Sequence, residues 1–197
     1  MWPWEHALFA YVFFSAYVHL WYRVPPGEFS VVALAFGSVF PDIVDKPLAW
    51  QFGLFETGWN VAHSIFVAVP ISLLVYAVAR RWGHNRVGIA FGFGYLLHFA
   101  GDVLPASLSR NRLYLEPILW PVGNPTVSQN HESFSGGVQY LFAQYIGQLL
   151  SFELTPVLTL QLLSVVLGTG LWLYDGRPGL RLVTDPFRRA LTAVANR

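Results

Sequence analysis

Four long apolar runs constrain the fold of this chain more than any other feature of its sequence. A helix that crosses a bilayer needs roughly 20 mostly apolar residues, because the hydrocarbon core is about 30 Å thick and a helix rises about 1.5 Å per residue. The runs that approach this length cover residues 6–22, 61–79, 87–108 and 155–174. They predict an all-α, polytopic bundle of transmembrane helices in a single domain that spans residues 1–197.

A shorter apolar run between Phe29 and Phe40 is closed by Pro41. We expect it to form a tilted or half-inserted helix packed against the others, because lipid leaves exposed irregular backbone without hydrogen-bond partners. With it, the bundle has about four to five membrane segments. Residues 139–152 carry a stripe of glutamines on an otherwise apolar pattern. That pattern predicts a helix that lies at the membrane interface or packs sideways on the bundle.

Two segments are expected to lie outside the membrane helices. Residues 109–137 are rich in Pro, Gly, Asn and Ser and predict one long loop, a feature that is often functional in a compact domain. Residues 186–197 predict a short basic amphipathic tail. The chain starts Met-Trp-Pro-Trp-Glu-His, without a basic n-region or a small-residue cleavage site, so we expect the first helix to remain in the mature protein.

The composition agrees with a membrane protein and argues against several other classes. Hydrophobic residues make up 54 % of the chain and charged residues 12 %, which is too few charges to cover an ordinary soluble domain. The formal net charge of +1 gives no reason to expect a nucleic-acid partner. Because the chain has no cysteine, any metal ion must be held by nitrogen and oxygen donors.

The distribution of basic residues predicts the orientation. If alternate ends of the predicted helices share a face, nine of the 12 Lys and Arg residues lie on that face. Basic residues favour the cytoplasmic side of a membrane, so we expect a multi-pass protein of the cell membrane with this face in the cytoplasm. The opposite face keeps only Lys46, Arg110 and Arg112.

Six ionisable side chains interrupt the apolar runs, where each costs roughly 2.5–3.5 kcal/mol on insertion scales. His98 and Asp102 lie within the third long run at the i, i+4 spacing that places two side chains on one helix face. The predicted topology brings all six to one layer nearer the non-cytoplasmic side. The six residues are His6, Asp42, Asp45, His63, His98 and Asp102.

Three imidazoles and three carboxylates match a site for a divalent ion such as zinc, manganese or iron. Six donors are more than one tetrahedral ion needs. Two arrangements therefore fit: a centre with two ions, or one ion whose ligands are oriented by the remaining residues. Structural roles are also open for single members: Asp42 as a turn residue, His6 as an interfacial group, and His98 with Asp102 as a hydrogen-bonded pair. The coincidence of all six in one layer favours a site.

These residues resemble the family of membrane-bound, metal-dependent hydrolases of the inner membrane, which includes proteins described as binding the LexA repressor. The resemblance covers about residues 1–125 and rests on five elements in order. They are His6, Pro41-Asp42-Ile43-Val44-Asp45, His63-Ser64, His98-Phe99-Ala100-Gly101-Asp102 and Leu119-Trp120-Pro121. The Trp2-Pro3-Trp4 start and the segment 45–50 are similar to archaeal, in particular haloarchaeal, members. Many members carry a His-Arg pair shortly before the His-Ser element, where this sequence has Thr57-Gly58.

The leading hypothesis, which the resemblance implies, is metal-dependent hydrolysis. One or two divalent ions, zinc or manganese, would be bound by His6, Asp42, His63, His98 and Asp102, with Asp45 as a further ligand or the catalytic base. A site within a membrane leaflet points to an ester or phosphoester substrate, for which a lipid is one candidate. It also points to membrane lipids as partners. The weaker candidates for substrate contacts are Arg110, Arg112, His131 and Glu132.

Two functions from other classes fit the same residues. Intramembrane histidines and carboxylates also form ion pathways and proton relays, so a metal or proton transporter or sensor is one alternative. The other is a non-catalytic membrane protein whose metal ion only stabilises the bundle.

Overall fold

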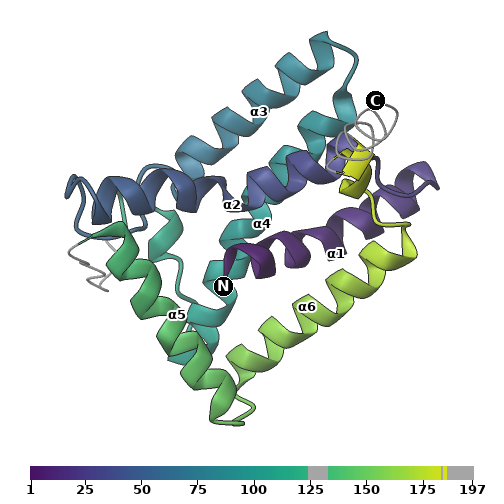
Figure 1. Cartoon of the computed structure of the whole chain (residues 1–197). Coiled ribbons are helices and arrows are strands. Elements are labelled where there is room, and N and C mark those ends of the chain that lie inside the picture. Colours follow the sequence, from purple (N-terminus) through teal and green to yellow (C-terminus); the bar gives the residue numbers. More distant parts are fainter. Residues whose placement is uncertain (124–132, 183, 186–197) are drawn as a thin grey trace, which may run out of the picture.

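The computed structural model describes residues 1–123, 133–182 and 184–185. Over these residues all regular secondary structure is helical, as the sequence predicts. The helices are α1 (Pro3–Tyr22), α2 (Glu28–Trp50), α3 (Ile65–Arg81), α4 (Asn85–Arg110), η1 (Glu116–Ile118), α5 (Phe134–Leu150) and α6 (Pro156–Tyr174). Figure 1 shows α1, α2 and α4 across the middle of the molecule, with α3, α5 and α6 around them.

Two of the described helices, α4 and α6, are long and apolar enough to cross a membrane. This is fewer than the four to five segments expected. The helices α3 and α5 have 17 residues each. The helix α2 carries four charged side chains, and histidine, glutamate, tyrosine and tryptophan lower the mean hydropathy of α1. The apolar runs therefore form helices, but only two of them have the length and composition of a span.

The helix α2 continues through Pro41 to Trp50, so the expected short segment is in fact a helix of 23 residues. A proline inside a helix removes a backbone donor and disfavours continuation. Close packing against α4 compensates: a Cβ atom at Gly37 would collide with the backbone of Phe91, and one at Gly94 with α2. Glycines at such a crossing let two helix backbones approach closely. As a consequence, Asp42 lies inside the helix rather than at its end.

The helix α4 is the centre of the bundle, because it packs against α1, α2, α3 and α6. Its buried aromatic side chains Phe91, Tyr95 and Phe99 form one part of the core, and Phe40 of α2 packs against them. A second part of the core surrounds Phe14 of α1. The middle of α4 is therefore held in the interior, where α1 and α2 approach it.

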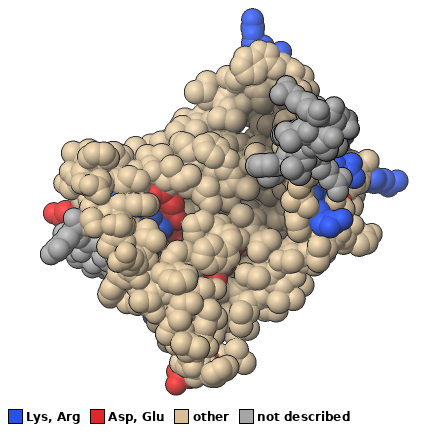
Figure 2. All heavy atoms as spheres, in the orientation of Figure 1, with Lys and Arg blue, Asp and Glu red and all other residues tan. Residues whose placement is uncertain are grey.

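The ends of α1, α4 and α6 meet at the end of the bundle that carries most of the described arginines. The guanidinium of Arg86 lies 4.3 Å from the centre of the Tyr22 ring. Beyond α6, the backbone N–H of Gly179 donates to a carboxylate oxygen of Glu28. Figure 2 shows basic side chains at the top and right of the molecule, near these ends.

Asp175, directly after α6, ties that helix to α1. Its buried carboxylate accepts hydrogen bonds from Tyr11 and Ser15 at 2.7 Å each and pairs with His19 Nε2 at 2.6 Å. Burial raises the pKa of the carboxyl, but the hydrogen bonds from Ser15, His19 and Tyr11 outweigh it and hold the pKa below its usual value.

The segments expected outside the bundle differ from expectation in detail. The predicted loop 109–137 contains η1 and the first turn of α5, and the glutamine-striped segment 139–152 forms most of α5. His131 and Glu132 lie outside the described residues, as does the predicted basic tail at 186–197.

Candidate metal centre

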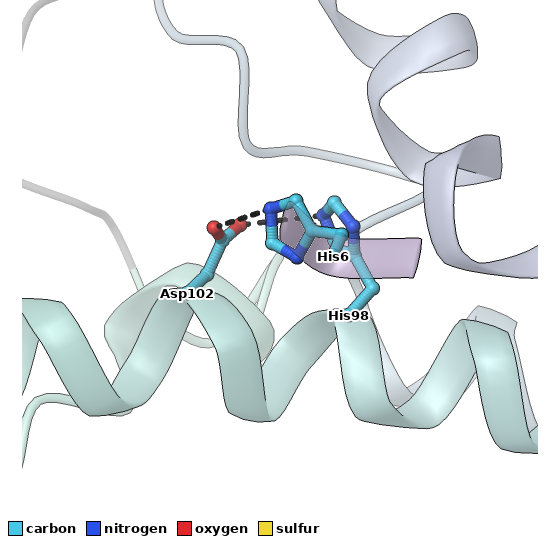
Figure 3. Close-up of side chains that lie close together, drawn as sticks. All are labelled: His6, His98 and Asp102. Atoms are coloured by element: carbon cyan, nitrogen blue, oxygen red, sulfur yellow. Dashed lines mark ion pairs between the residues drawn. The ribbon is translucent and has the colours of Figure 1, made fainter. Parts of the chain in front are cut away.

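Five of the six predicted site residues converge in the interior, from four different segments. His6 comes from α1, Asp42 from α2, His63 from the segment before α3, and both His98 and Asp102 from α4. The three histidines are at most 1 % exposed, whereas the side chains of Asp42 and Asp102 are 8 % and 9 % exposed. Figure 3 shows Asp102 and His98 on one face of α4, with the His6 ring beside them.

Donor atoms of Asp42, His63 and His98 lie around one point, and an oxygen of Asp102 approaches both histidines. His63 Nε2 lies 3.1 Å from His98 Nε2, 3.5 Å from Asp42 Oδ1 and 3.6 Å from Asp102 Oδ2. His98 Nε2 lies 3.3 Å from Asp102 Oδ2 and 3.9 Å from Asp42 Oδ1. Donors around a tetrahedral zinc ion, bound at about 2.0–2.1 Å, are roughly 3.3 Å apart. The separations around the two Nε2 atoms lie near that value, so His63 and His98 with a carboxylate fit a divalent ion.

Hydrogen bonds on the far side of each ring fix which nitrogen carries the proton. His98 Nδ1 lies 2.7 Å from the carbonyl oxygen of Ser38, which can only accept, so His98 is protonated at Nδ1. His63 Nδ1 lies 2.8 Å from Asp45 Oδ2, which fixes His63 in the same way. When both rings are neutral, their Nε2 lone pairs therefore face the same space. Metal-binding histidines are commonly oriented by such partners.

Asp45 lies behind His63 and not with the other five residues. Its carboxylate accepts the backbone N–H groups of Asn60, Ala62 and His63 as well as His63 Nδ1. Tyr95 holds the same segment through a 2.7 Å hydrogen bond to the carbonyl oxygen of Ala62. Asp45 therefore orients His63 and the loop that carries it, and its oxygens are engaged away from the converging donors.

The His-Ser and Leu-Trp-Pro elements of the sequence also meet. The hydroxyl of Ser64 donates to the carbonyl oxygen of Trp120 at 2.6 Å. Since Ser64 precedes α3 directly, this bond anchors the start of that helix and the residue next to His63.

His6 extends the centre on the other side of Asp102. Its Nε2 lies 3.3 Å from Asp102 Oδ1, and its ring stacks on that of His98 with centroids 4.0 Å apart. Both ring nitrogens are buried and have no hydrogen-bond partner among the described residues. Gly101 makes room for the ring, because a Cβ atom there would lie 2.7 Å from His6 Nδ1. Asp102 Oδ1 also pairs with the N-terminal amine of Met1 at 3.7 Å, and His6, His98 and Asp102 form a second group of potential ligands.

Lys46 is a member of the site that sequence reasoning did not assign. Its Nζ atom lies 2.7 Å from Asp42 Oδ2, on the side opposite the histidines. The i, i+4 spacing of Asp42 and Lys46 on one helix could have revealed this pair. A cavity of about 440 Å³ opens at this point, lined by Asp42, Lys46 and Asp102.

The two arginines predicted as substrate contacts lie elsewhere. The guanidinium of Arg110 stacks on the ring of Tyr114 at 4.1 Å, and Arg112 pairs with Glu116 at 3.2 Å. Neither arginine lines the cavity beside Asp42.

A family model described as YdjM inner membrane protein matches residues 1–180, which include every residue of the centre. The chain belongs to the YdjM inner membrane protein family. Membership in the YdjM family, together with the apolar helices α4 and α6, identifies the chain as a membrane protein. No curated protein and no solved structure matches the chain.

Proposed function

We propose that this YdjM-family chain is a metal-dependent hydrolase that cleaves an ester or phosphoester. The proposal rests on the 3.1 Å approach of His63 Nε2 to His98 Nε2 while both Nδ1 atoms are engaged elsewhere. A divalent cation at this point would engage both Nε2 atoms and a nearby carboxylate oxygen of Asp42 or Asp102.

The donor set indicates how ions would be held. His63, His98, Asp42 and Asp102 would hold one ion, and His6 with the second oxygen of Asp102 would contribute to another. Nitrogen and oxygen donors without sulfur suit zinc or manganese. When bound, such an ion supplies Lewis acidity, which lowers the pKa of a coordinated water from about 15.7 toward 7.

The remaining residues position and protect the site. Asp45 and the Ser38 carbonyl keep His63 and His98 in the protonation state that metal binding requires. The cavity gives a substrate access to the side of the centre formed by Asp42 and Asp102. These two carboxylates are also in reach of a proton released there, whereas the oxygens of Asp45 are already occupied. Lys46, on the cavity side, is placed to stabilise negative charge that develops on a substrate.

The arrangement of the helix ends supports a site nearer the non-cytoplasmic side. Arg86 packs on Tyr22, and His19 pairs with Asp175, so the ends that carry Arg23 and Arg177 lie together. The candidate centre lies at the opposite halves of α1 and α4. If the basic end faces the cytoplasm, the centre lies toward the outer leaflet, where membrane lipids are the nearest partners.

Turnover by protein with restored metal tests this proposal. The chain would be purified in detergent, stripped with a chelator, and reconstituted with zinc or manganese before assay on carboxylic esters, phosphomonoesters and phosphodiesters. We expect hydrolysis of one class that depends on metal and is lost in His98→Ala. His84→Ala, on the exposed turn before α4, is the matched control and should retain activity.

Two other outcomes would favour the alternatives. Metal-dependent uptake into liposomes without hydrolysis of any ester would indicate a transporter. A rise in melting temperature on metal addition, with every substrate class unreacted, would indicate a structural ion.

A further inference from the structure

The cavity beside the centre has the size of a ligand site. It lies between the N-terminal end of α1, the C-terminal half of α2 and α5, and its volume of about 440 Å³ falls in the range of small-molecule pockets. Asp42 and Asp102 both line it, so it opens onto the candidate metal centre. Figure 2 shows acidic and basic atoms side by side between the regions of α2 and α5, within a surface that is otherwise mostly uncharged.

Most of the wall and the rim of this cavity is apolar. The wall includes the indole rings of Trp2, Trp50 and Trp59. At the rim, Ile43 is 54 % exposed and Phe134 is 40 % exposed. A hydrocarbon chain would bury this apolar surface favourably, whereas a fully polar substrate would leave it in contact with water. The walls and the rim thus favour a ligand with an apolar part that enters from the membrane.

The inner end of the cavity favours an anion. Lys46 is the only lysine of the chain and the only cationic side chain that lines the cavity among the described residues. Its ammonium lies 2.7 Å from Asp42 Oδ2 and 5.7 Å from the centre of the Trp50 ring. Asp42 and Asp102 would balance the charge of one divalent ion. The positive charge of Lys46 then remains for a ligand, and an ammonium is a common phosphate partner.

Two glutamines of the α5 stripe line the same cavity. Gln144 and Gln148 line it from α5, opposite the part of α2 that carries Lys46. These glutamines thus supply polar groups between the apolar wall and the charged end of the cavity. They suit a ligand whose apolar chain and anionic group are joined by polar atoms.

We infer that this cavity binds an amphiphilic phosphoester, with its phosphate against Lys46 and the metal centre and its apolar chain along the tryptophans and α5. The inference rests on the proposed hydrolase function and specifies its substrate class. The shared chemistry is a phosphate on a hydrocarbon chain, which a membrane phospholipid or a soluble alkyl phosphate can supply.

Because the chain has one lysine, its ammonium can report binding directly. Reductive methylation with ¹³C-formaldehyde labels only Lys46 and the N-terminal amine and keeps the charge of both. The ¹³C signal of Lys46 would be followed in nonionic detergent during titration with decyl phosphate, inorganic phosphate or neutral decyl glycerol. We expect a saturable shift with decyl phosphate and none with the other two at equal concentration. A nanodisc containing phosphatidic acid should reproduce the shift if a membrane lipid is the source.

Two pairs of variants test the parts of the site separately in an unlabelled binding assay with decyl phosphate. Lys46→Met should weaken binding about tenfold or more, while Lys46→Arg should retain most of it. Val138→Trp, which fills the cavity from α5, should abolish binding without loss of bound metal, whereas Val69→Trp on the outer face of α3 should not change it.

The outcomes distinguish this inference from the proposed function. An equal response to inorganic phosphate, or no response to decyl phosphate from protein that holds metal and hydrolyses an ester, would overturn the inference alone. A saturable shift with decyl phosphate in protein that never binds metal would support the cavity and count against the hydrolase.

Discussion

The Nε2 atoms of His63 and His98 lie 3.1 Å apart in the interior of the bundle, 35 residues apart in sequence. Asp45 and the Ser38 carbonyl hold the far side of each ring, so neither imidazole can rotate without breaking a buried hydrogen bond. Two neutral imidazoles whose Nε2 lone pairs face each other at this distance would repel one another, and either a proton or a metal ion between them removes the repulsion. This relationship is the physical basis of the candidate centre, and the predictions below follow from the contacts around it.

Asp45→Asn should weaken metal binding without removing a ligand. The amide keeps one acceptor oxygen but loses the negative charge that fixes His63, so we expect the affinity for zinc to fall by about 10- to 100-fold. Competition with a chelator measures this change. At saturating zinc the number of bound ions should equal that of the wild type, and a lower number would contradict a purely orienting role. Asp185→Asn, at an exposed position, is the control.

Gly101→Ala should displace His6. The added Cβ atom would lie 2.7 Å from His6 Nδ1 and 3.0 Å from His6 Cε1, so the ring must move away from Asp102. We expect a lower melting temperature and fewer bound ions per chain if His6 helps to hold a second ion. Gly92→Ala on the same helix is a matched control, since its Cβ atom would make ordinary contacts with Ser72 at 3.5 Å. Equal behaviour of the two variants would contradict the packing of His6 on Gly101.

Asp175→Asn should loosen the joint between α1 and α6. The carboxylate accepts three hydrogen bonds in a buried position, and loss of its charge should cost about 1.5–3 kcal/mol. For a chain of this size that is a fall in melting temperature of roughly 3–12 °C. Thermal unfolding in detergent at neutral pH measures this fall. An unchanged melting temperature would show that the contact of Asp175 with α1 does not contribute to stability.

The same carboxyl predicts acid sensitivity. Because the folded-state pKa of Asp175 lies below its usual value, its contribution to stability is complete above the unfolded pKa of about 3.9 and is lost as the pH falls through the folded pKa. The melting temperature of the wild type should therefore drop more steeply below about pH 4 than that of Asp175→Asn. Parallel curves for the two proteins would contradict this.

The sequence predicts which residues could form the centre, because charged groups in apolar runs are costly and therefore conspicuous. The spacing of His98 and Asp102 on α4 also predicts their shared face. The structure further brings His6, Asp42 and His63 to that face, as the predicted topology requires. The meeting of α1, α2 and α4 depends on helix packing that no single segment reveals.

Other features depend on long-range contacts and could not be predicted. Pro41 suggested the end of a helix, but the glycine-mediated contact between α2 and α4 outweighs the local effect of the proline. Asp45 lies on the same helix as Asp42. The following loop nevertheless folds back, so that the Asp45 oxygens accept hydrogen bonds from backbone N–H groups within residues 60–63. Periodicity carries no information about such a loop.

The metal content of purified protein tests the central claim most directly. Elemental analysis of detergent-purified wild-type chain incubated with zinc or manganese, then separated from free metal, should find at least about one ion per chain, because the donors of Asp42, His63 and His98 converge. His63→Ala and His98→Ala should lose that ion while circular dichroism still shows a helical fold, and His84→Ala should keep it. A helical, monodisperse wild-type protein without a stoichiometric divalent ion would contradict the account.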